Sequence, residues 1–344
     1  MTQNPTTIQV EEVPLDRWDE VVQTFPGHTV FQRSPWLSAI ADAYDVDPLL
    51  LVARRDGRCE AVWPSLVQKV GPFRVVGSPR PGWCTVYLGP LFREDADVPA
   101  LLSAFMQHPP LRRASYTFCK VSSPGRPVDL EPHGFEHLRD YRTYIVDLQK
   151  SEEDLWSALE KRCRKMVRKG ARAGLTVRRE EGTDYIDDFW KMSVEVFGRS
   201  GIKPSYSRRL LDLVVERLTE SDSLLVTSAM LEGKRVAMQV MPYDRVGSYA
   251  WAAASYAEYR HLAVYNILDW ESILEAKRLG ISTYDLVSVY GGPGYYKRSF
   301  GPEERVTAAF WERYSSPVAR MGKKVYASLL RRRQRAAPGP SAEA

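Results

Sequence analysis

The sequence predicts an α/β protein, of the α+β type, built from two similar halves. Short runs of β-branched and aromatic residues, bounded by turn formers, alternate with segments of helical period along most of the chain. The 344 residues are enough for two domains, and a similar order of helices and strands recurs in both halves. We therefore expect an internal structural duplication, although the sequence similarity between the halves is faint.

The first half is expected to start with a strand and a helix and to continue through a hairpin. Ser34 and Pro35 suit a helix start, as N-cap and first helical residue. Gly57 lies in a turn between two strand-like runs, which predicts the hairpin. Residues 77–90 hold too many glycines and prolines for a regular element. The expected strands are 8–10, 48–54, 59–69, 114–121 and 141–148, and the expected helices are 15–25, 37–44 and 98–106.

The second half is expected to begin with a helix and to repeat this alternation. Gly233 lies in the turn of a second hairpin, and Gly280 ends a long helix. The run 291–294 is predicted to be a loop, and 338–344 is predicted to be disordered. The expected strands are 175–179, 223–231, 235–243, 248–253 and 283–287, and the further helices are 185–196, 206–220 and 264–279.

The helix that opens the second half is strongly basic. Ser151 and Asp154 resemble a capping box before it, and Gly170 and Gly174 supply stop signals. One side carries Leu155, Trp156, Leu159, Cys163, Met166 and Val167. Seven cations occupy residues 161–172 without a carboxylate among them. A solvated face is one interpretation, but like charges repel, and a polyanionic partner would relieve that repulsion.

The basicity of the chain is local. The net charge is +5, and residues 320–335 carry seven further cations: Arg320, Lys323, Lys324, Arg331, Arg332, Arg333 and Arg335. Without the two basic stretches the rest of the chain would be net acidic. This distribution favours docking sites over a generally adhesive surface, and the basic tail could contact a membrane peripherally.

Several function classes lack their sequence signals. Cys59, Cys84, Cys119 and Cys163 form no CxxC pair, no secretory signal or membrane-spanning run is visible, and we expect a cytoplasmic protein. Nucleophile-elbow and Walker motifs are absent. His133 and His137 have a metal-compatible spacing but no supporting Cys or carboxylate cluster, so no metal or cofactor is expected. Because signals for nucleophilic and metal-assisted catalysis are missing, we expect catalysis by positioning two substrates, with polar groups stabilising charge.

A series of short motifs in one order resembles the FemAB family. They are the Arg/Lys-rich helix ending in Gly, Phe189-x-x-Met192 with Arg199-x-Gly201, Glu232-Gly-Lys-x-x-Ala237, Ala254-Ser-Tyr256, the Trp270 helix ending in Gly280, and Tyr284-Asp285 before Tyr296-Lys297-x-x-Phe300-Gly301. The resemblance covers most of residues 150–305. It implies an aminoacyl-tRNA-dependent peptidyltransferase made of two GNAT-like domains, each with a mixed, mostly antiparallel sheet flanked by helices.

The resemblance also implies how the domains are divided and used. The expected limits are 1–150 for the first domain, 151–312 for the donor and catalytic domain, 313–335 for a basic helix that packs back on the first domain, and 336–344 for a disordered tail. The acceptor would bind between the domains and the aminoacyl-tRNA along the second. No coiled-coil arm fits between residues 180 and 223, so an interpeptide-bridge role is doubtful, and an amine of a small molecule or peptide is the expected acceptor.

Site residues follow by the same resemblance. Lys297 would stabilise the oxyanion of a tetrahedral intermediate. Tyr256 would orient the carbonyl or the leaving ribose hydroxyl, or else only pack at a strand end. Asp285 would accept a proton from the amine, or serve only as a structural strand-end group, which we favour. The other candidates are Arg199, Lys203, Tyr206, Tyr87, Tyr296 and Phe300 for substrate, and Lys161, Arg164, Lys165, Arg168 and Arg172 for tRNA.

Three functional hypotheses stay open. A CoA-type loop would place glycines before a helix to hold a diphosphate, and Arg260-His-Leu-Ala263-Val-Tyr265 lacks them. This favours an aminoacyl-tRNA donor over an acyl-CoA donor, with an amine of a small molecule or peptide as acceptor and no covalent enzyme intermediate. The third hypothesis is a non-catalytic RNA- or membrane-binding module that uses the two basic stretches.

Overall fold

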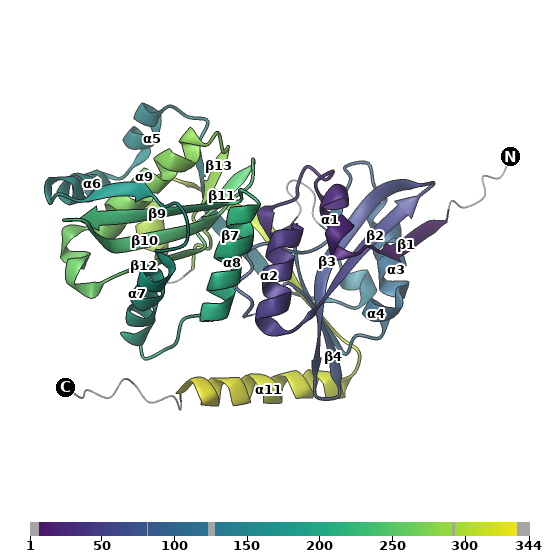
Figure 1. The fold of residues 1–344 in the computed structure, drawn as a ribbon. Helices are drawn as coiled ribbons and strands as arrows, with labels where there is room; N and C mark the ends of the chain where they lie inside the picture. Colours follow the sequence, from purple (N-terminus) through teal and green to yellow (C-terminus); the bar gives the residue numbers. More distant parts are fainter. Residues whose placement is uncertain (1–6, 81, 123–127, 291–292, 336–344) are drawn as a thin grey trace. The chain divides into compact units, whose positions relative to one another are not determined.

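The computed structural model describes residues 7–80, 82–122, 128–290 and 293–335. It divides into two compact units (Figure 1). The first holds the chain to Tyr141 and Val306–Arg331, and the second holds Arg142–Arg305 with residues 332–335 of the last helix. Strands β7 (Glu136–Asp147) and β14 (Glu303–Tyr314) each cross a unit boundary. The predicted domain limits stay a prediction, because these units are defined by packing and not by independent folding.

The first unit is built on a mostly antiparallel sheet in the order β1-β2-β3-β4-β6-β14, with β5 paired to β3. Only β4 and β6 run parallel among these pairs. Its strands are β1 (Ile8–Glu12), β2 (Asp47–Arg55), β3 (Arg58–Val70), β4 (Phe73–Ser78), β5 (Leu91–Phe92) and β6 (Tyr116–Val121). Its α-helices are α1 (Leu15–Val22), α2 (Ser34–Tyr44), α3 (Val98–Gln107), α4 (Pro109–Arg112) and most of α11 (Pro317–Arg335).

The hairpin predicted at Gly57 is confirmed, and its turn explains the sequence signal. Asp56 and Gly57 both adopt positive φ, at 50° and 79°. This pair of left-handed residues matches the twist of the two strands that it joins. The first unit's core includes Trp63 in a T-shaped contact with Phe105. Helix α2 begins at Ser34, so Arg33 and not Ser34 occupies the N-cap position.

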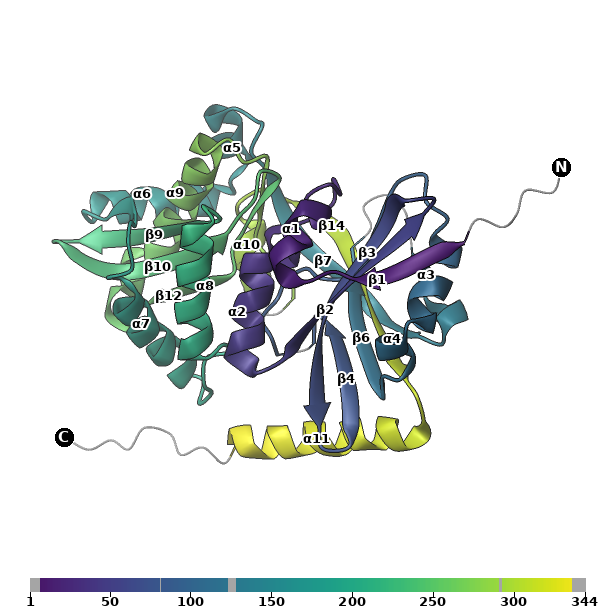
Figure 2. The same ribbon diagram turned by 45° about the vertical axis from the view of Figure 1, so that its right-hand side comes forward.

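The second unit contains two groups of paired strands, and Figure 2 labels β9, β10 and β12 of the first group and β7 of the second. One is an antiparallel sheet in the order β12-β10-β9-β8, and the other runs β7-β13-β11 with β11 and β13 parallel. The strands are β8 (Thr176–Arg179), β9 (Leu224–Leu231), β10 (Lys234–Pro242), β11 (Gly247–Tyr249), β12 (Ala252–Ser255) and β13 (Thr283–Asp285). The helices are α5 (Glu152–Ala158), α6 (Lys161–Arg172), α7 (Ile186–Gly198), α8 (Arg208–Glu220), α9 (Val264–Arg278) and α10 (Pro293–Arg298).

Helix α9 forms the centre of the second unit's packing. It lies against β8, β9 and β10, and α6 packs on it in turn. The predicted end of α9 at Gly280 is confirmed within two residues, with Gly280 at φ 74°. No helix among the described residues has the length and apolar character needed to cross a membrane.

The structure differs from the sequence prediction at several points. The helix expected to contain Leu155 and Val167 is two helices, α5 and α6, because Leu159 and Glu160 are extended and the Glu160 N–H donates to the Ser299 carbonyl at 2.8 Å. Ser151 caps α5 as predicted. The strand expected at 248–253 is split into β11 and β12, and β4 was not predicted. Residues 291–292 of the expected loop and the tail 338–344 lie outside the described residues.

Candidate functional site

A cluster of polar side chains surrounds Lys297 in the second unit, and Asp285 is the other predicted catalytic residue in it. Lys297 and Tyr296 come from α10, Asp285 ends β13, Asp269 lies on α9 and Gln239 lies on β10. Four separate elements therefore contribute to one cluster. Local sequence explains why each element forms, but only the tertiary fold brings the side chains of the four elements close together.

Lys297 is held by backbone carbonyl groups. Its Nζ donates to the carbonyl oxygen of Val287 and, at 3.3 Å, to that of Ser288. Val287 and Ser288 have φ of 53° and 66°, which is unusual for non-glycine residues and especially for a β-branched one. An ammonium has three N–H donors, so a third donor is left beyond these two bonds. The strained turn thus fixes a cation whose remaining donor can serve a ligand.

The charge of Lys297 depends on its neighbours. Burial lowers its pKa below the ordinary lysine value, while the negative charges of Asp269 and then Asp285 act to raise it. The two carboxylates therefore help to keep the ammonium protonated inside the protein. A buried cation with compensating charges is a frequent feature of functional sites.

Asp269 is the buried acid of the cluster and was not predicted from the sequence. It is 6% exposed, and the Tyr296 hydroxyl donates to its Oδ2 at 2.5 Å. Burial raises its pKa to about 6, against the opposing effects of Tyr296, Gln239 and Lys297. At neutral pH it is therefore mostly ionised. Its sequence signal is a carboxylate surrounded by apolar residues in Ile267-Leu268-Asp269-Trp270, which favours burial with a partner.

Asp285 has the structural contacts that the sequence interpretation favoured. Its Oδ1 accepts hydrogen bonds from the Thr143 hydroxyl and, at 2.7 Å, from the Val287 N–H. The second bond spans two residues and stabilises the turn whose carbonyl groups hold Lys297. Asp285 is 3% exposed, so its carboxylate acts as a buried anchor for that turn.

Tyr256 lies at a different part of the second unit's surface. It follows Ser255, the last residue of β12, and donates its backbone N–H to the Val236 carbonyl at 3.1 Å. Its ring lines a pocket of about 350 Å³. The pocket is lined by Arg178, Asp188, Met230, Gly233, Lys234, Arg235, Tyr256, Glu258 and Tyr259, which do not include Lys297. The structure therefore does not bring Tyr256 and Lys297 together through this pocket.

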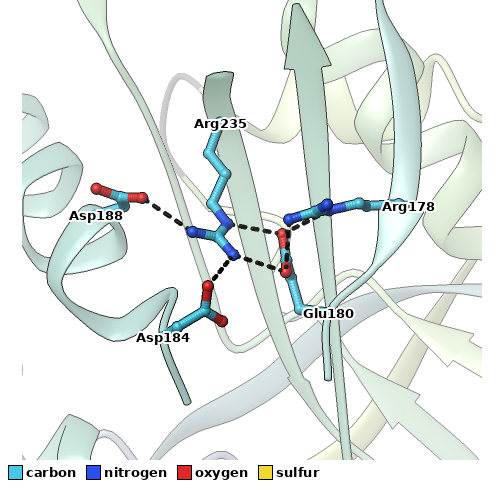
Figure 3. Close-up of polar contacts among 5 residues, drawn as sticks. All are labelled: Arg178, Glu180, Asp184, Asp188 and Arg235. Atoms are coloured by element: carbon cyan, nitrogen blue, oxygen red, sulfur yellow. Dashed lines mark hydrogen bonds and ion pairs between the residues drawn. The ribbon is translucent and has the colours of Figure 1, made fainter. Parts of the chain in front are cut away.

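Arg235 organises the wall of that pocket (Figure 3). Its guanidinium donates to Glu180 at 2.9 Å and to Asp184 at 2.7 Å, and a third bond reaches Asp188 at 3.2 Å. Glu180 is additionally paired with Arg178 at 3.2 Å. Although burial acts to raise the pKa of Glu180, the bond from Arg235 and the other hydrogen bonds lower it overall. The network joins β10 to the start of α7, and sequence reasoning did not identify it.

The residues predicted to bind substrate come from both units, and the structure gives them different surroundings. Tyr206 is a core residue, because it is 6% exposed, its hydroxyl contacts Ser193 at 2.9 Å and its ring packs on Trp251. Arg199 pairs with Glu195 at 3.6 Å, and Lys203 is exposed.

Two further candidates from that set have aromatic packing roles. Phe300 is buried and makes a T-shaped contact with Tyr296, which fixes the ring next to Lys297. Tyr87 belongs to the first unit, where its hydroxyl contacts Thr307 at 2.9 Å.

The cationic face of α6 is only partly available for a ligand. Arg164 donates to the carbonyl groups of Ser157, at 2.8 Å, and Leu159, so it caps the end of α5. Arg168 lies over the Trp156 ring at 5.2 Å. Arg172 donates to the Arg168 carbonyl at 3.2 Å.

Of the remaining α6 cations, Lys169 donates to the His261 carbonyl at 2.6 Å, and Lys161, Arg162 and Lys165 are exposed. Across the described part of the chain no α6 cation forms an ion pair with a carboxylate. The positive surface is therefore not neutralised internally.

The histidines proposed as a weak metal motif have other contacts or surroundings. His137 contacts Asp140 at 3.2 Å and the Trp311 ring, and His133 lies in a short 3-10 helix. Among residues that the structure describes, no three His, Cys, Asp or Glu side chains gather as metal ligands.

Comparison with known proteins identifies the fold. Residues 157–298 match the acetyltransferase (GNAT) domain family. Comparison with curated protein sequences gives no match. Among solved structures, FemX is similar with a TM-score of 0.72 and 15% identity, over 93% of this chain and 99% of FemX.

Two other solved structures have the same fold at lower similarity. L-PGS from Bacillus licheniformis has a TM-score of 0.58 and 15% identity, over 94% of this chain and 98% of that one. A tandem GNAT protein from the clavulanic acid biosynthesis pathway has a TM-score of 0.52 and 13% identity, over 90% and 99%. The predicted resemblance is thus confirmed at the level of the fold: this chain has a FemAB-like tandem GNAT fold, and residues 157–298 match the GNAT domain model.

Proposed function

We propose that this protein is an acyltransferase that moves an aminoacyl group from tRNA to an amine of a small molecule or peptide. The observation that carries the proposal is the half-buried ammonium of Lys297, fixed by two backbone carbonyl groups with one donor left over. The GNAT domain match and the FemAB-like fold support acyl transfer as the reaction class.

The proposed reaction needs no covalent enzyme intermediate. The neutral amine nitrogen attacks the ester carbonyl carbon, a C–N bond forms, and the carbonyl π electrons move to oxygen. Lys297 stabilises this oxyanion. When the intermediate collapses, the C–O bond to the ribose breaks, and the proton lost by the amine neutralises the departing ribose oxygen. The products are an amide and a free tRNA 3′ end.

Within this mechanism Asp269 acts through Lys297 and Tyr296. Its carboxylate accepts the Tyr296 hydrogen bond at 2.5 Å and supplies negative charge that favours protonated Lys297. Asp285 contributes the second negative charge and holds the turn at Val287. Both are positioning residues in this proposal, and Lys297 is the group that touches the reacting oxygen.

The exposed cations of α6 support a nucleic-acid donor. Side-chain cations bind phosphates without needing a glycine loop, and such binding is salt-dependent. Lys161 and Lys165 are exposed and lack carboxylate partners among the residues described, while Arg164 is occupied in capping α5. We therefore assign the donor contact mainly to Lys161 and Lys165, with Arg168 and Arg172 beside them.

An acyl-CoA donor is the second candidate. Its support is that the matching domain family is named for acetyl transfer. In the turn before α9, Ala263 adopts a left-handed conformation with φ 62°. The turn therefore has a backbone conformation typical of glycine although no glycine is present. Against it, the run Arg260-His-Leu-Ala263-Val-Tyr265 has none of the glycines that expose backbone N–H groups to a diphosphate. We further propose a cytoplasmic setting and a role in natural-product or cell-wall biosynthesis.

One transfer assay separates these donors. The full chain is incubated with a small-metabolite extract and either aminoacyl-tRNA labelled on the amino acid or labelled acyl-CoA. We expect label to enter a small molecule from aminoacyl-tRNA, and ribonuclease treatment of the donor beforehand should abolish it. Transfer from acyl-CoA alone would replace the proposal by the second candidate. Salt-sensitive RNA binding without any transfer would indicate a non-catalytic binding module.

A further inference from the structure

Helix α11 presents an apolar stripe to solvent. Val318, Met321 and Val325 are 69%, 68% and 55% exposed. Their spacing of three and then four residues places them on one side of the helix. Exposing an apolar stripe of a helix to water is unfavourable in free energy, so such a stripe often marks a surface that binds a partner or a membrane.

The packing of α11 on its own unit uses a different side of the helix. Ala319 is 4% exposed, and a side chain at Gly322 would meet the Phe73 ring at 2.8 Å, so the helix lies close to that ring. Lys323 pairs with Glu312 and lies 4.8 Å above the Tyr116 ring. The apolar stripe is therefore not needed for these contacts.

The charge of the helix identifies what can cover the stripe. Residues 317–335 include seven Lys or Arg and no Asp or Glu. Arg320 and Lys323 are paired with Glu136 and Glu312. Lys324 is exposed beside the stripe and has no carboxylate partner in the described chain. The helix thus combines an apolar face with a surplus of positive charge.

We propose that α11 binds an anionic lipid surface, with Val318, Met321 and Val325 entering the boundary between headgroups and acyl chains. Helices of this composition bind membranes through buried apolar area together with attraction of Lys and Arg to anionic headgroups. RNA phosphates would neutralise the cations but would leave valine and methionine in water. A second copy stacked on the same face would bring two sets of like charges together.

This surface is independent of the transfer reaction proposed above. None of its residues belongs to the Lys297 cluster, and Val318, Met321, Lys324 and Val325 lie in the first unit. If the proposed aminoacyl-tRNA donor were wrong, the membrane-binding proposal would be unaffected. A protein without transfer activity would still bind the vesicles.

The test is sedimentation of the full chain with vesicles. One set of vesicles is phosphatidylcholine alone, and the other also contains phosphatidylglycerol. We expect binding to the anionic set only, weakened by salt. Replacing Val318, Met321 and Val325 together by serine should lower the affinity at least about tenfold. The matched control replaces Val194, Val246 and Val306 by serine, which lie outside α11 and are 46%, 51% and 54% exposed, and should bind like the wild type.

Three results would overturn the proposal. The first is no binding of the wild type to anionic vesicles. The second is equal loss in the stripe variant and its control, or loss in neither. The third is a wild-type dimer in analytical ultracentrifugation that the stripe substitutions dissociate, which would make a second copy the occupant. Circular dichroism and thermal unfolding of each variant show that the fold persists.

Discussion

Lys297→Met tests the reacting centre most directly. Methionine keeps the length of the side chain and removes its charge and donors. Two of the three ammonium donors bind the Val287 and Ser288 carbonyl groups, so the substitution removes one donor from the developing oxyanion. Loss of one such donor costs about 10²–10³ in kcat, or about 3–4 kcal/mol of transition-state stabilisation.

Lys277→Met is the matched control for this prediction. Lys277 is also a half-buried lysine of the second unit, and its Nζ donates to two backbone carbonyl groups, those of Leu148 and Lys150, each at 2.8 Å. Its loss removes the same kind of anchoring bonds without touching the Lys297 cluster. In a single-turnover assay, the transfer rate of Lys297→Met should be lower than that of the wild type by a factor of about 10²–10³. The transfer rate of Lys277→Met should stay within about threefold of the wild-type rate. Equal rates for the two variants, with both folded, would refute the role of Lys297.

The other predictions concern the groups around this lysine and the basic helix. Asp269→Asn removes the first of the charges that raise the pKa of Lys297, so the alkaline fall of the pH–rate profile should move to lower pH; an unmoved profile would contradict the pairing. Lys165→Gln should weaken aminoacyl-tRNA binding and lower the salt slope by about one, measured by filter binding. Arg164→Gln should instead lower the unfolding free energy by about 1–3 kcal/mol, because α5 loses its cap. Gly301→Ala should destabilise by about 2–4 kcal/mol in thermal unfolding, because Gly301 has φ 68° and an added Cβ would lie 2.3 Å from the Ala158 carbonyl oxygen.

Much of the fold could be predicted from local sequence. The turns at Gly57 and Gly233 and the end of α9 at Gly280 depend on residues near one another in the chain, and all three appear in the structure. The break between α5 and α6 could not be predicted. It depends on a hydrogen bond from Glu160 to Ser299, which are far apart in sequence.

The candidate site was predictable in part. Lys297 and Asp285 followed from a motif, but Asp269 did not, because an aspartate in a helix gives no sign of which neighbour it will meet. Arg164 and Lys165 are adjacent cations that the sequence cannot tell apart. The fold separates them by directing one to the end of α5 and leaving the other in solvent.

The sequence by itself determined the alternation of helices and strands, the positions of the main turns and the two concentrations of positive charge. These features follow from the period of apolar residues, from backbone preferences of glycine and from formal charge, which are all local. Only the tertiary structure decided which charges are buried, paired or free. Burial and distance set the pKa of Asp269 and of Lys297, and both quantities arise from contacts between elements that the chain brings together only when it folds.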